Sequence, residues 1–228
     1  MLLYYITDLN QFPGDSVERR AQLLDRITQA AEAGVDCIQL REKDLAGHAL
    51  AQLAERALRR IEPYRDRTRL LINSRLDVAL AVGAGGIHLA SDDLSAGQAR
   101  QIAGQFRTQN FLVGISCHAV SEVRLAAEQG ADFVVLAPIF EKVLAPPAVS
   151  SEASEARDAR LPGIGCQAIR EATRSASVPI LALGGVNLSN AALCLAAGAA
   201  GVAAIRLFQQ GTVAETVRRL RALERSPD

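Results

Sequence analysis

The sequence predicts a single α/β domain with the (β/α)8 TIM-barrel fold. One short pattern recurs four times along the chain: an Ala-rich helical segment, a glycine and a short apolar run. Glycine favours the left-handed residue that ends a helix, and a run that is apolar on both faces suits a strand buried in a parallel sheet. Each copy therefore predicts a helix, a turn and a buried strand. The four copies lie at residues 33–40, 82–89, 129–136 and 197–204.

Four further apolar runs bring the expected strands to eight, at residues 4–7, 70–73, 111–116 and 179–183. Helical patterns lie between the strands, for example at residues 17–33, 45–61, 75–82, 119–129 and 190–197. Strands that alternate regularly with helices are typical of a closed parallel barrel. An open doubly wound sheet is the alternative, but no Gly-x-Gly-x-x-Gly motif follows the first strand.

Length, charge and cysteine content restrict the class of protein. The 228 residues fit one domain, and the 25 basic residues balance the 25 acidic residues. No net field therefore attracts nucleic acid or an anionic membrane, and we expect a small-molecule partner. A homo-oligomer is a further expectation. The four cysteines form no Cys-x-x-Cys pair, and we find neither a secretory leader nor a membrane-spanning apolar run. These features predict a cytoplasmic protein.

One irregular segment, residues 137–163, is rich in Ala, Pro, Ser and Glu and falls after the sixth expected strand. Ligands of such barrels bind at the loops that follow the strands. A long loop at this position therefore predicts either a cover for the ligand or an inert surface insertion.

The end of the second strand carries the clearest binding pattern. Gln39, Arg41 and Lys43 alternate along the chain, which places them on one side as the strand leaves the barrel. An amide and two cations suit a phosphate or a diphosphate. The alternative is a salt-bridge cluster with Glu42 at the rim.

The third and fourth strands end in further polar residues. Asn73 could face a ligand, whereas Ser74 and Asp77 resemble the start of a capped helix. Asp93 could bind Mg²⁺ that carries phosphate oxygens, or it could cap the next helix.

The fifth strand places Ser116 and His118 at the barrel mouth. His118 is the candidate general acid and base because imidazole titrates near neutral pH. Its alternative role is to cap the next helix. His88 lies inside a strand pattern and is expected to be a buried residue of the barrel interior.

The seventh and eighth units provide a second possible phosphate site. Gly184 and Gly185 would let backbone N–H groups approach an anion, and Arg206 could add positive charge. The glycine pair could instead only form a tight turn.

With these motifs placed, the chain resembles the thiamine phosphate synthase and TenI family along nearly its whole length. The resemblance implies a barrel that binds thiazole phosphate and, in synthases, hydroxymethylpyrimidine diphosphate held with Mg²⁺. Synthases join the two substrates and expel diphosphate. The motifs that carry the resemblance lie, in the family's order, at residues 5–8, 39–43, 71–73, 86–89, 114–118, 138–140 and 183–186.

The resemblance also implies roles for individual residues. Asp93 would be a Mg²⁺ ligand, Ser116 would lie near the reacting groups, and Gly184 would contact the thiazole phosphate. The residues that would hold the pyrimidine diphosphate are Gln39, Arg41, Lys43 and Asn73.

Three positions depart from the synthase pattern. Ser74 replaces the second Mg²⁺-binding Asp, so the metal site keeps the single carboxylate of Asp93. Lys142 is the only charge that remains where synthases have a phosphate-binding Thr-x-Thr-Lys run. Arg206 replaces a phosphate-binding Ser, which either enlarges the anion site or fills it.

These departures favour a TenI-like thiazole tautomerase in which His118 moves the proton. This reaction needs neither a diphosphate leaving group nor Mg²⁺ or another cofactor. The alternative is a Mg²⁺-dependent thiamine phosphate synthase. A noncatalytic sensor that kept the phosphate pocket is the second alternative.

Overall fold

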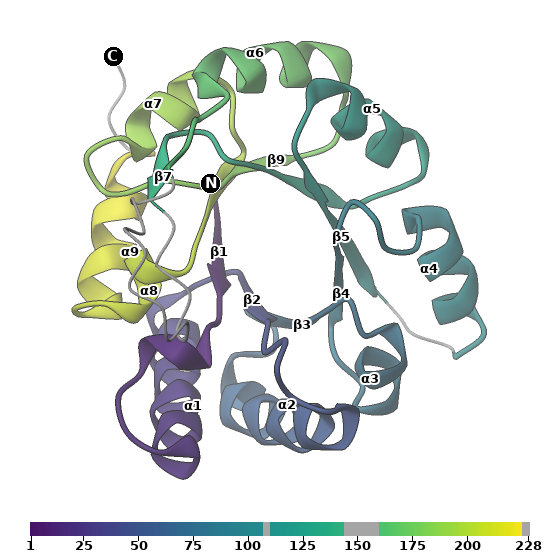
Figure 1. Cartoon of the computed structure of the whole chain (residues 1–228), viewed down its shortest axis with the longest axis vertical. Coiled ribbons are helices and arrows are strands. Elements are labelled where there is room, and N and C mark those ends of the chain that lie inside the picture. The colour runs from purple at the N-terminus through teal and green to yellow at the C-terminus, as the bar shows by residue number, and fades with distance from the viewer. Residues whose placement is uncertain (107–109, 144–159, 225–228) are drawn as a thin grey trace, which may run out of the picture.

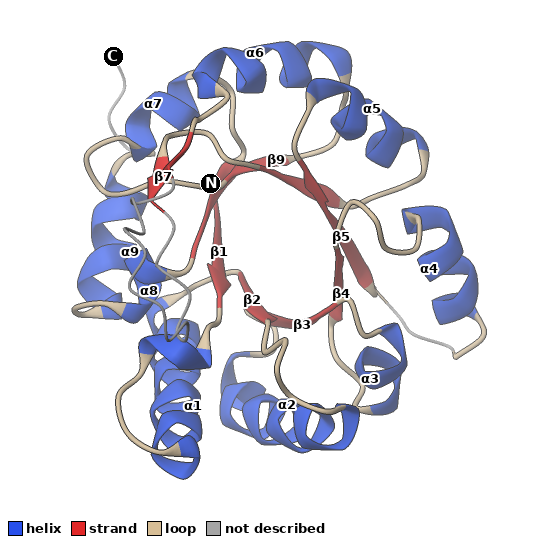
Figure 2. Cartoon of the chain, in the orientation of Figure 1, coloured by secondary structure: helices blue, strands red, loops and turns tan. Residues whose placement is uncertain are grey.

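The computed structural model describes residues 1–106, 110–143 and 160–224 and confirms a closed barrel of parallel strands (Figures 1 and 2). Around the barrel the strands follow the order β1-β10-β9-β6-β5-β4-β3-β2. The predicted doubly wound alternative is therefore excluded. The barrel strands are β1 (Leu2–Ile6), β2 (Cys37–Leu40), β3 (Arg69–Asn73), β4 (Gly86–Leu89), β5 (Leu112–Cys117), β6 (Phe133–Leu136), β9 (Ile180–Ala182) and β10 (Gly201–Ala204).

Helices surround the barrel and shield the outer faces of its strands (Figure 2). The five helices whose ranges were predicted, now α1, α2, α3, α5 and α7, agree with the prediction to within two residues at each end. The recurring glycine ends the preceding helix as predicted: Gly34 lies directly after α1 with a φ of 93°. The helices are α1 (Ser16–Ala33), α2 (Gly47–Ile61), α3 (Leu76–Ala81), α4 (Ala96–Gly104), α5 (Val120–Glu128), α6 (Gly165–Ser175), α7 (Ala191–Ala196), α8 (Arg206–Gln209) and α9 (Val213–Ala222).

Apolar side chains pack inside the barrel and between its strands and the helices. The interior set comprises Tyr4, Ile6, Leu71, Phe133, Val135, Leu181 and Ala203. A Cβ atom added at Gly114 would lie 2.3 Å from the ring of Phe133, so this glycine makes room for the ring. The packed interior leaves the carboxyl ends of the strands as the place for a site.

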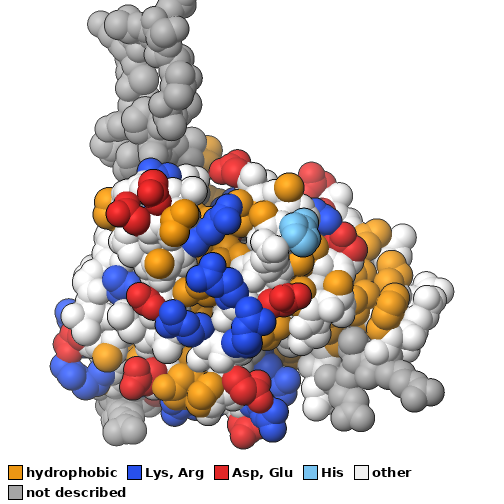
Figure 3. All heavy atoms as spheres, turned by 90° about the horizontal axis from the view of Figure 1, so that it is seen from below, with side chains coloured by type: hydrophobic (Ala, Val, Ile, Leu, Met, Phe, Trp, Pro, Cys, Tyr) orange, Lys and Arg blue, Asp and Glu red, His pale blue; other side chains and the backbone are white. Residues whose placement is uncertain are grey.

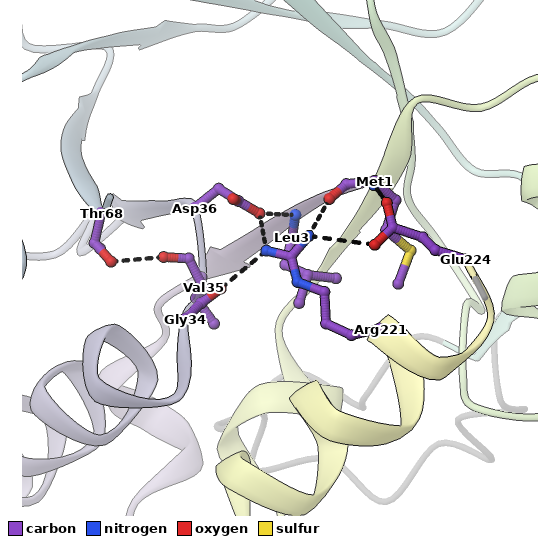
Figure 4. A network of polar contacts seen from close by, with 8 residues as sticks. All are labelled: Met1, Leu3, Gly34, Val35, Asp36, Thr68, Arg221 and Glu224. Carbon is purple, nitrogen blue, oxygen red and sulfur yellow. Dashed lines mark hydrogen bonds and ion pairs between the residues drawn. The ribbon is translucent and has the colours of Figure 1, made fainter. Parts of the chain in front are cut away.

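At the opposite end of the strands, a polar network joins the first strand to the last helix (Figure 4). Arg221 of α9 donates to the carbonyl oxygen of Gly34 at 3.0 Å and to Oδ2 of Asp36 at 2.7 Å, and it also contacts the carbonyl oxygen of Met1. The same Asp36 oxygen accepts from the backbone nitrogen of Leu3 at 2.6 Å. The network therefore links β1, the α1–β2 turn and α9 to one another at this end of the barrel.

The segment predicted as a long loop, residues 137–163, contains a short antiparallel ribbon of β7 (Lys142–Val143) and β8 (Arg160–Leu161). The prediction of a wholly irregular loop is therefore wrong at these residues. Residues 144–159 lie outside the described part of the chain, so a role in covering a ligand stays a prediction.

The surface carries charges of both signs. On the face shown in Figure 3, Lys and Arg side chains gather near the centre with acidic side chains beside them. This mixture agrees with the balanced composition. Within the described ranges, none of the helices has the length and apolar character needed to span a membrane.

Candidate active site

A row of hydrogen-bonded side chains crosses three neighbouring strand ends. Gln39 Nε2 donates to Asn73 Oδ1 at 2.7 Å, and Asn73 Nδ2 donates to Ser74 Oγ at 3.0 Å. Ser74 Oγ then donates to Asp93 Oδ2 at 2.6 Å. Parallel strands bring their carboxyl ends to one edge, so residues far apart in the sequence become neighbours here. The structure thus joins four residues that the sequence singled out separately.

The structure excludes the predicted capping role of Ser74. Its hydroxyl binds Asp93, while Arg75 precedes α3 without a side-chain cap and pairs with Asp77 at 2.6 Å. Ser74 also has a φ of 59°, in the left-handed region that a residue other than glycine adopts at a cost of about 1 kcal/mol. Backbone strain of this kind is concentrated at functional sites.

The capping alternative for Asp93 is also wrong. Ser95 and Gln98 form the capping box of α4 instead. Asp93 Oδ2 accepts from the backbone nitrogen of Ala90 at 2.8 Å as well as from Ser74. Asp93 is exposed at the rim, and its Oδ1 accepts no hydrogen bond from any described residue.

Gln39 has an unsatisfied acceptor at the centre of this row. The side chain is 2% exposed, and its Oε1 has no hydrogen-bond partner among the described residues. A buried amide oxygen without a partner costs about 1–3 kcal/mol relative to one that is hydrogen-bonded. A donor on a bound ligand would remove this cost.

The predicted salt-bridge cluster around Glu42 is not formed. Glu42 accepts from the Thr7 hydroxyl and, at 2.9 Å, from the backbone nitrogen of Leu9. Burial raises the pKa of Glu42 to about 7, and the Thr7 hydrogen bond opposes the shift. In the described part of the chain, neither Arg41 nor Lys43 forms an ion pair, so both cations are available to an anion.

The prediction that His88 lies buried in the barrel is confirmed. It is 2% exposed, and burial, followed by the charge of Arg41, lowers its pKa to about 3. His88 contacts Ser116 through Nε2 at 2.9 Å and Tyr4 through Nδ1 at 3.0 Å. Neither contact was predicted from the sequence, because the first strand was identified there without assigning Tyr4 to either of its faces.

His118 lies apart from this interior group. Its ring donates from Nδ1 to the carbonyl oxygen of Ala137 at 2.8 Å, so in the neutral ring Nε2 is the nitrogen that can accept a proton. The residue that caps α5 is Ala119, without a side-chain bond, so the predicted capping alternative for His118 is wrong. The ring is exposed, and its role as general acid and base stays a prediction.

Gly184 and Gly185 adopt positive φ values of 90° and 66°. A Cβ atom at Gly184 would lie 2.7 Å from Pro138 Cα, and one at Gly185 would lie 2.7 Å from Phe140 Cβ. The pair therefore does more than turn the chain, because it lets the segment after β6 approach closely. Within the described ranges, neither glycine amide donates a hydrogen bond.

The remaining two predicted phosphate ligands are Arg206 and Lys142. Arg206 begins α8, is exposed, and has no ion pair among the described residues. Lys142 lies in β7, and its side chain lies outside what the structure describes. Both remain predicted phosphate ligands.

Asp93 and Ser74 form the candidate Mg²⁺ site. No cluster of three or more His, Cys, Asp or Glu side chains suited to a metal exists among the described residues. Mg²⁺ nevertheless often binds through one or two carboxylates together with substrate phosphates and waters. One free carboxylate oxygen on Asp93 beside the Ser74 hydroxyl fits an ion that binds together with a diphosphate.

Comparison with known proteins decides the family. A family model described as thiamine monophosphate synthase matches residues 3–208. The chain belongs to this family. It is 39% identical over 203 residues to a putative thiamine-phosphate synthase of Geobacter sulfurreducens, covering 89% of this chain and 84% of that protein. It is 38% identical over 221 residues to a thiamine-phosphate synthase of Methanoculleus marisnigri, covering 96% and 93%.

A solved structure agrees with this assignment. The thiamine phosphate pyrophosphorylase of Pyrococcus furiosus aligns with a TM-score of 0.76 and 26% identity, covering 97% of this chain and 94% of that one. The family resemblance predicted from the motifs is therefore confirmed, as is membership of a family of enzymes. The names of these relatives favour the synthase alternative over the expected tautomerase and over the sensor.

Proposed function

We propose that this protein is a thiamine phosphate synthase, which joins hydroxymethylpyrimidine diphosphate to thiazole phosphate. In this reaction the bond from the pyrimidine methylene carbon to the diphosphate oxygen breaks, and a carbon–nitrogen bond to the thiazole forms. The observation that carries the proposal is the row from Gln39 to Asp93 with Arg41 and Lys43 unpaired beside it. A thiazole tautomerase has no diphosphate to bind with these groups.

The pyrimidine diphosphate would lie along this row. Gln39 Oε1, the buried acceptor without a partner, would accept from the amino group of the pyrimidine. Arg41 would bind diphosphate oxygens through its planar fork, and Lys43 would add a point charge. The contact from the Arg41 backbone nitrogen to Thr7 Oγ1, at 3.0 Å, holds this segment in place.

The thiazole phosphate would bind on the other side of the mouth. The amides of Gly184 and Gly185, which donate to no described residue, would donate to the phosphate oxygens. Arg206 would add a charge-assisted contact there. The two substrates would then lie between the ends of β2 and β9, with their reacting atoms near the barrel axis.

Asp93 and Ser74 would hold Mg²⁺ once the diphosphate supplies the remaining oxygens. The bound ion would neutralise charge that develops on the departing diphosphate. Arg41 and Lys43 would also neutralise this charge, since both follow β2, the strand next to β3.

The test is an assay with both substrates, with and without Mg²⁺, that detects thiamine phosphate by fluorescence after oxidation. We expect product that depends on Mg²⁺, and we expect Gln39→Leu to lower kcat/KM by about 10- to 100-fold through loss of the amide. Gln52→Leu, which removes an exposed amide from α2, is the matched control and should behave as the parent. Absence of product, under conditions in which another synthase works, would overturn the proposal.

A further inference from the structure

A second hydrogen-bonded row lies inside the barrel, separate from the row that ends at Asp93. It begins at the hydroxyl of Tyr4 on β1, passes through both ring nitrogens of His88 on β4, and ends at the hydroxyl of Ser116 on β5. The two distances are 3.0 Å and 2.9 Å. Tyr4 and His88 are almost fully buried, whereas Ser116 is half-buried at the carboxyl end of its strand.

The chemistry of these groups determines which atom donates and which accepts in each hydrogen bond of the row. Among the described residues, His88 is the only hydrogen-bond partner of the Tyr4 hydroxyl. Burial raises the pKa of Tyr4 well above its ordinary value, so the hydroxyl keeps its proton. A buried O–H group with a single partner must donate to it, and Nδ1 of His88 therefore accepts.

A neutral imidazole that accepts at one nitrogen carries its proton on the other. Nε2 of His88 therefore donates to Oγ of Ser116. His88 stays neutral because it is buried next to aromatic rings, with its ring centroid 6.0 Å from that of Phe133. The charged groups that act on it are Arg41, which opposes protonation, and Asp93, which favours it.

We propose that Tyr4 and His88 are positioning residues that fix the Ser116 hydroxyl as a hydrogen-bond donor toward the bound diphosphate. Because Ser116 accepts from His88, its own proton is free to point out of the barrel. With the opposite direction, Ser116 would donate to His88 and present only lone pairs to an anion. This proposal depends on the synthase function proposed above.

The direction of the row is measured first, without reference to activity. In protein labelled with ¹⁵N-histidine, long-range ¹H–¹⁵N correlation spectra distinguish the two neutral tautomers, and the His88→Gln spectrum assigns the His88 signals. We expect His88 in the parent to carry its proton on Nε2 and to remain neutral through pH 5. A proton on Nδ1, or a charged ring at pH 6, would overturn the proposal even if Tyr4→Phe does not fold.

Two matched variants test the role of the Tyr4 hydroxyl. Tyr4→Phe removes it and should leave His88 as a mixture of both tautomers. Tyr5→Phe is the control, since Tyr5 points to the opposite side of β1 and packs against Phe208, with ring centroids 5.9 Å apart. An unchanged His88 tautomer in Tyr4→Phe, or an equal change in Tyr5→Phe, would contradict the proposed direction.

Kinetics test whether Tyr4 acts through Ser116. We expect Tyr4→Phe to lower kcat about tenfold with little change in KM, the size expected for one hydrogen bond. Added to Ser116→Ala, it should cause no further loss, because both changes remove the same donor. Additive losses would contradict the proposal that Tyr4 acts through Ser116. Inactivity of the parent would instead refute the synthase function, and the hydrogen-bond direction would then be judged from the tautomer result alone.

Discussion

The buried carboxyl group of Glu42 gives the protein a stability that depends on pH. Its pKa is raised from an ordinary value of 4.5 to about 7, mainly by burial. The folded state therefore binds the proton more tightly than the unfolded state, and the contribution is fully present below about pH 4.5 and lost as the pH rises through 7. The shift corresponds to about 3 kcal/mol of unfolding free energy.

The variant Glu42→Gln removes the titration while it keeps the side-chain volume and an oxygen that can accept from Leu9. His88 has the opposite effect, because its pKa is lowered to about 3 and its contribution is lost as the pH falls below about 6.5. The unfolding free energy of the parent therefore depends on pH through both Glu42 and His88. The difference in unfolding free energy between parent and variant isolates the contribution of Glu42.

The assay is urea unfolding of both proteins at several pH values from about 5 to about 8. We expect the parent to lose about 3 kcal/mol relative to Glu42→Gln across this range. A difference that stays constant with pH would show that the carboxyl group does not titrate in this window, and the burial argument would be refuted.

Two further predictions concern the ends of the barrel. Arg221→Ala should lower the unfolding free energy by about 2–3 kcal/mol, because it leaves the Asp36 carboxylate without its charged partner. Arg218→Ala, which removes an exposed pair with Glu215 on the same helix, should change it by no more than about 0.5 kcal/mol, and equal effects in urea unfolding would contradict this account. Ser74→Asp should bind Mg²⁺ about tenfold more tightly by adding a second carboxylate beside Asp93. The measurement is the Mg²⁺-dependent rise of Tm, and an equal rise in the parent would contradict the expectation.

The fold could be predicted because its signals are local. Each helix end, glycine and apolar run lies within about ten residues of sequence, as at Gly34 and the strand that follows it. Gln39, Asn73 and Ser116 could also be placed at the mouth, because each lies near the carboxyl end of an expected strand. No knowledge of distant contacts was needed for these steps.

The pairing of residues could not be predicted, since it depends on the register between strands. Asn73 lies beside His88, and His88 beside Gly114, only because β3, β4 and β5 pair in the observed register. That register brings Ser116 within hydrogen-bond distance of His88. The sequence around Ser74 resembles a helix cap. A short-range pattern of this kind does not show that Asp93, which follows the next strand, comes within hydrogen-bond distance of Ser74.

The polar network of Arg221 and the proposed site lie at opposite ends of the barrel strands, and Glu42 affects both stability and the proposed site. Arg221 and Asp36 join the chain at the amino ends of the strands, away from the row that runs from Gln39 to Asp93. Glu42 lies at the mouth, where burial of its charge reduces stability at and above neutral pH. It nevertheless orders Thr7, whose oxygen in turn accepts from the backbone nitrogen of Arg41. A residue that lowers stability but orders the segment proposed to bind the diphosphate is expected where function, rather than folding, determines the side chain.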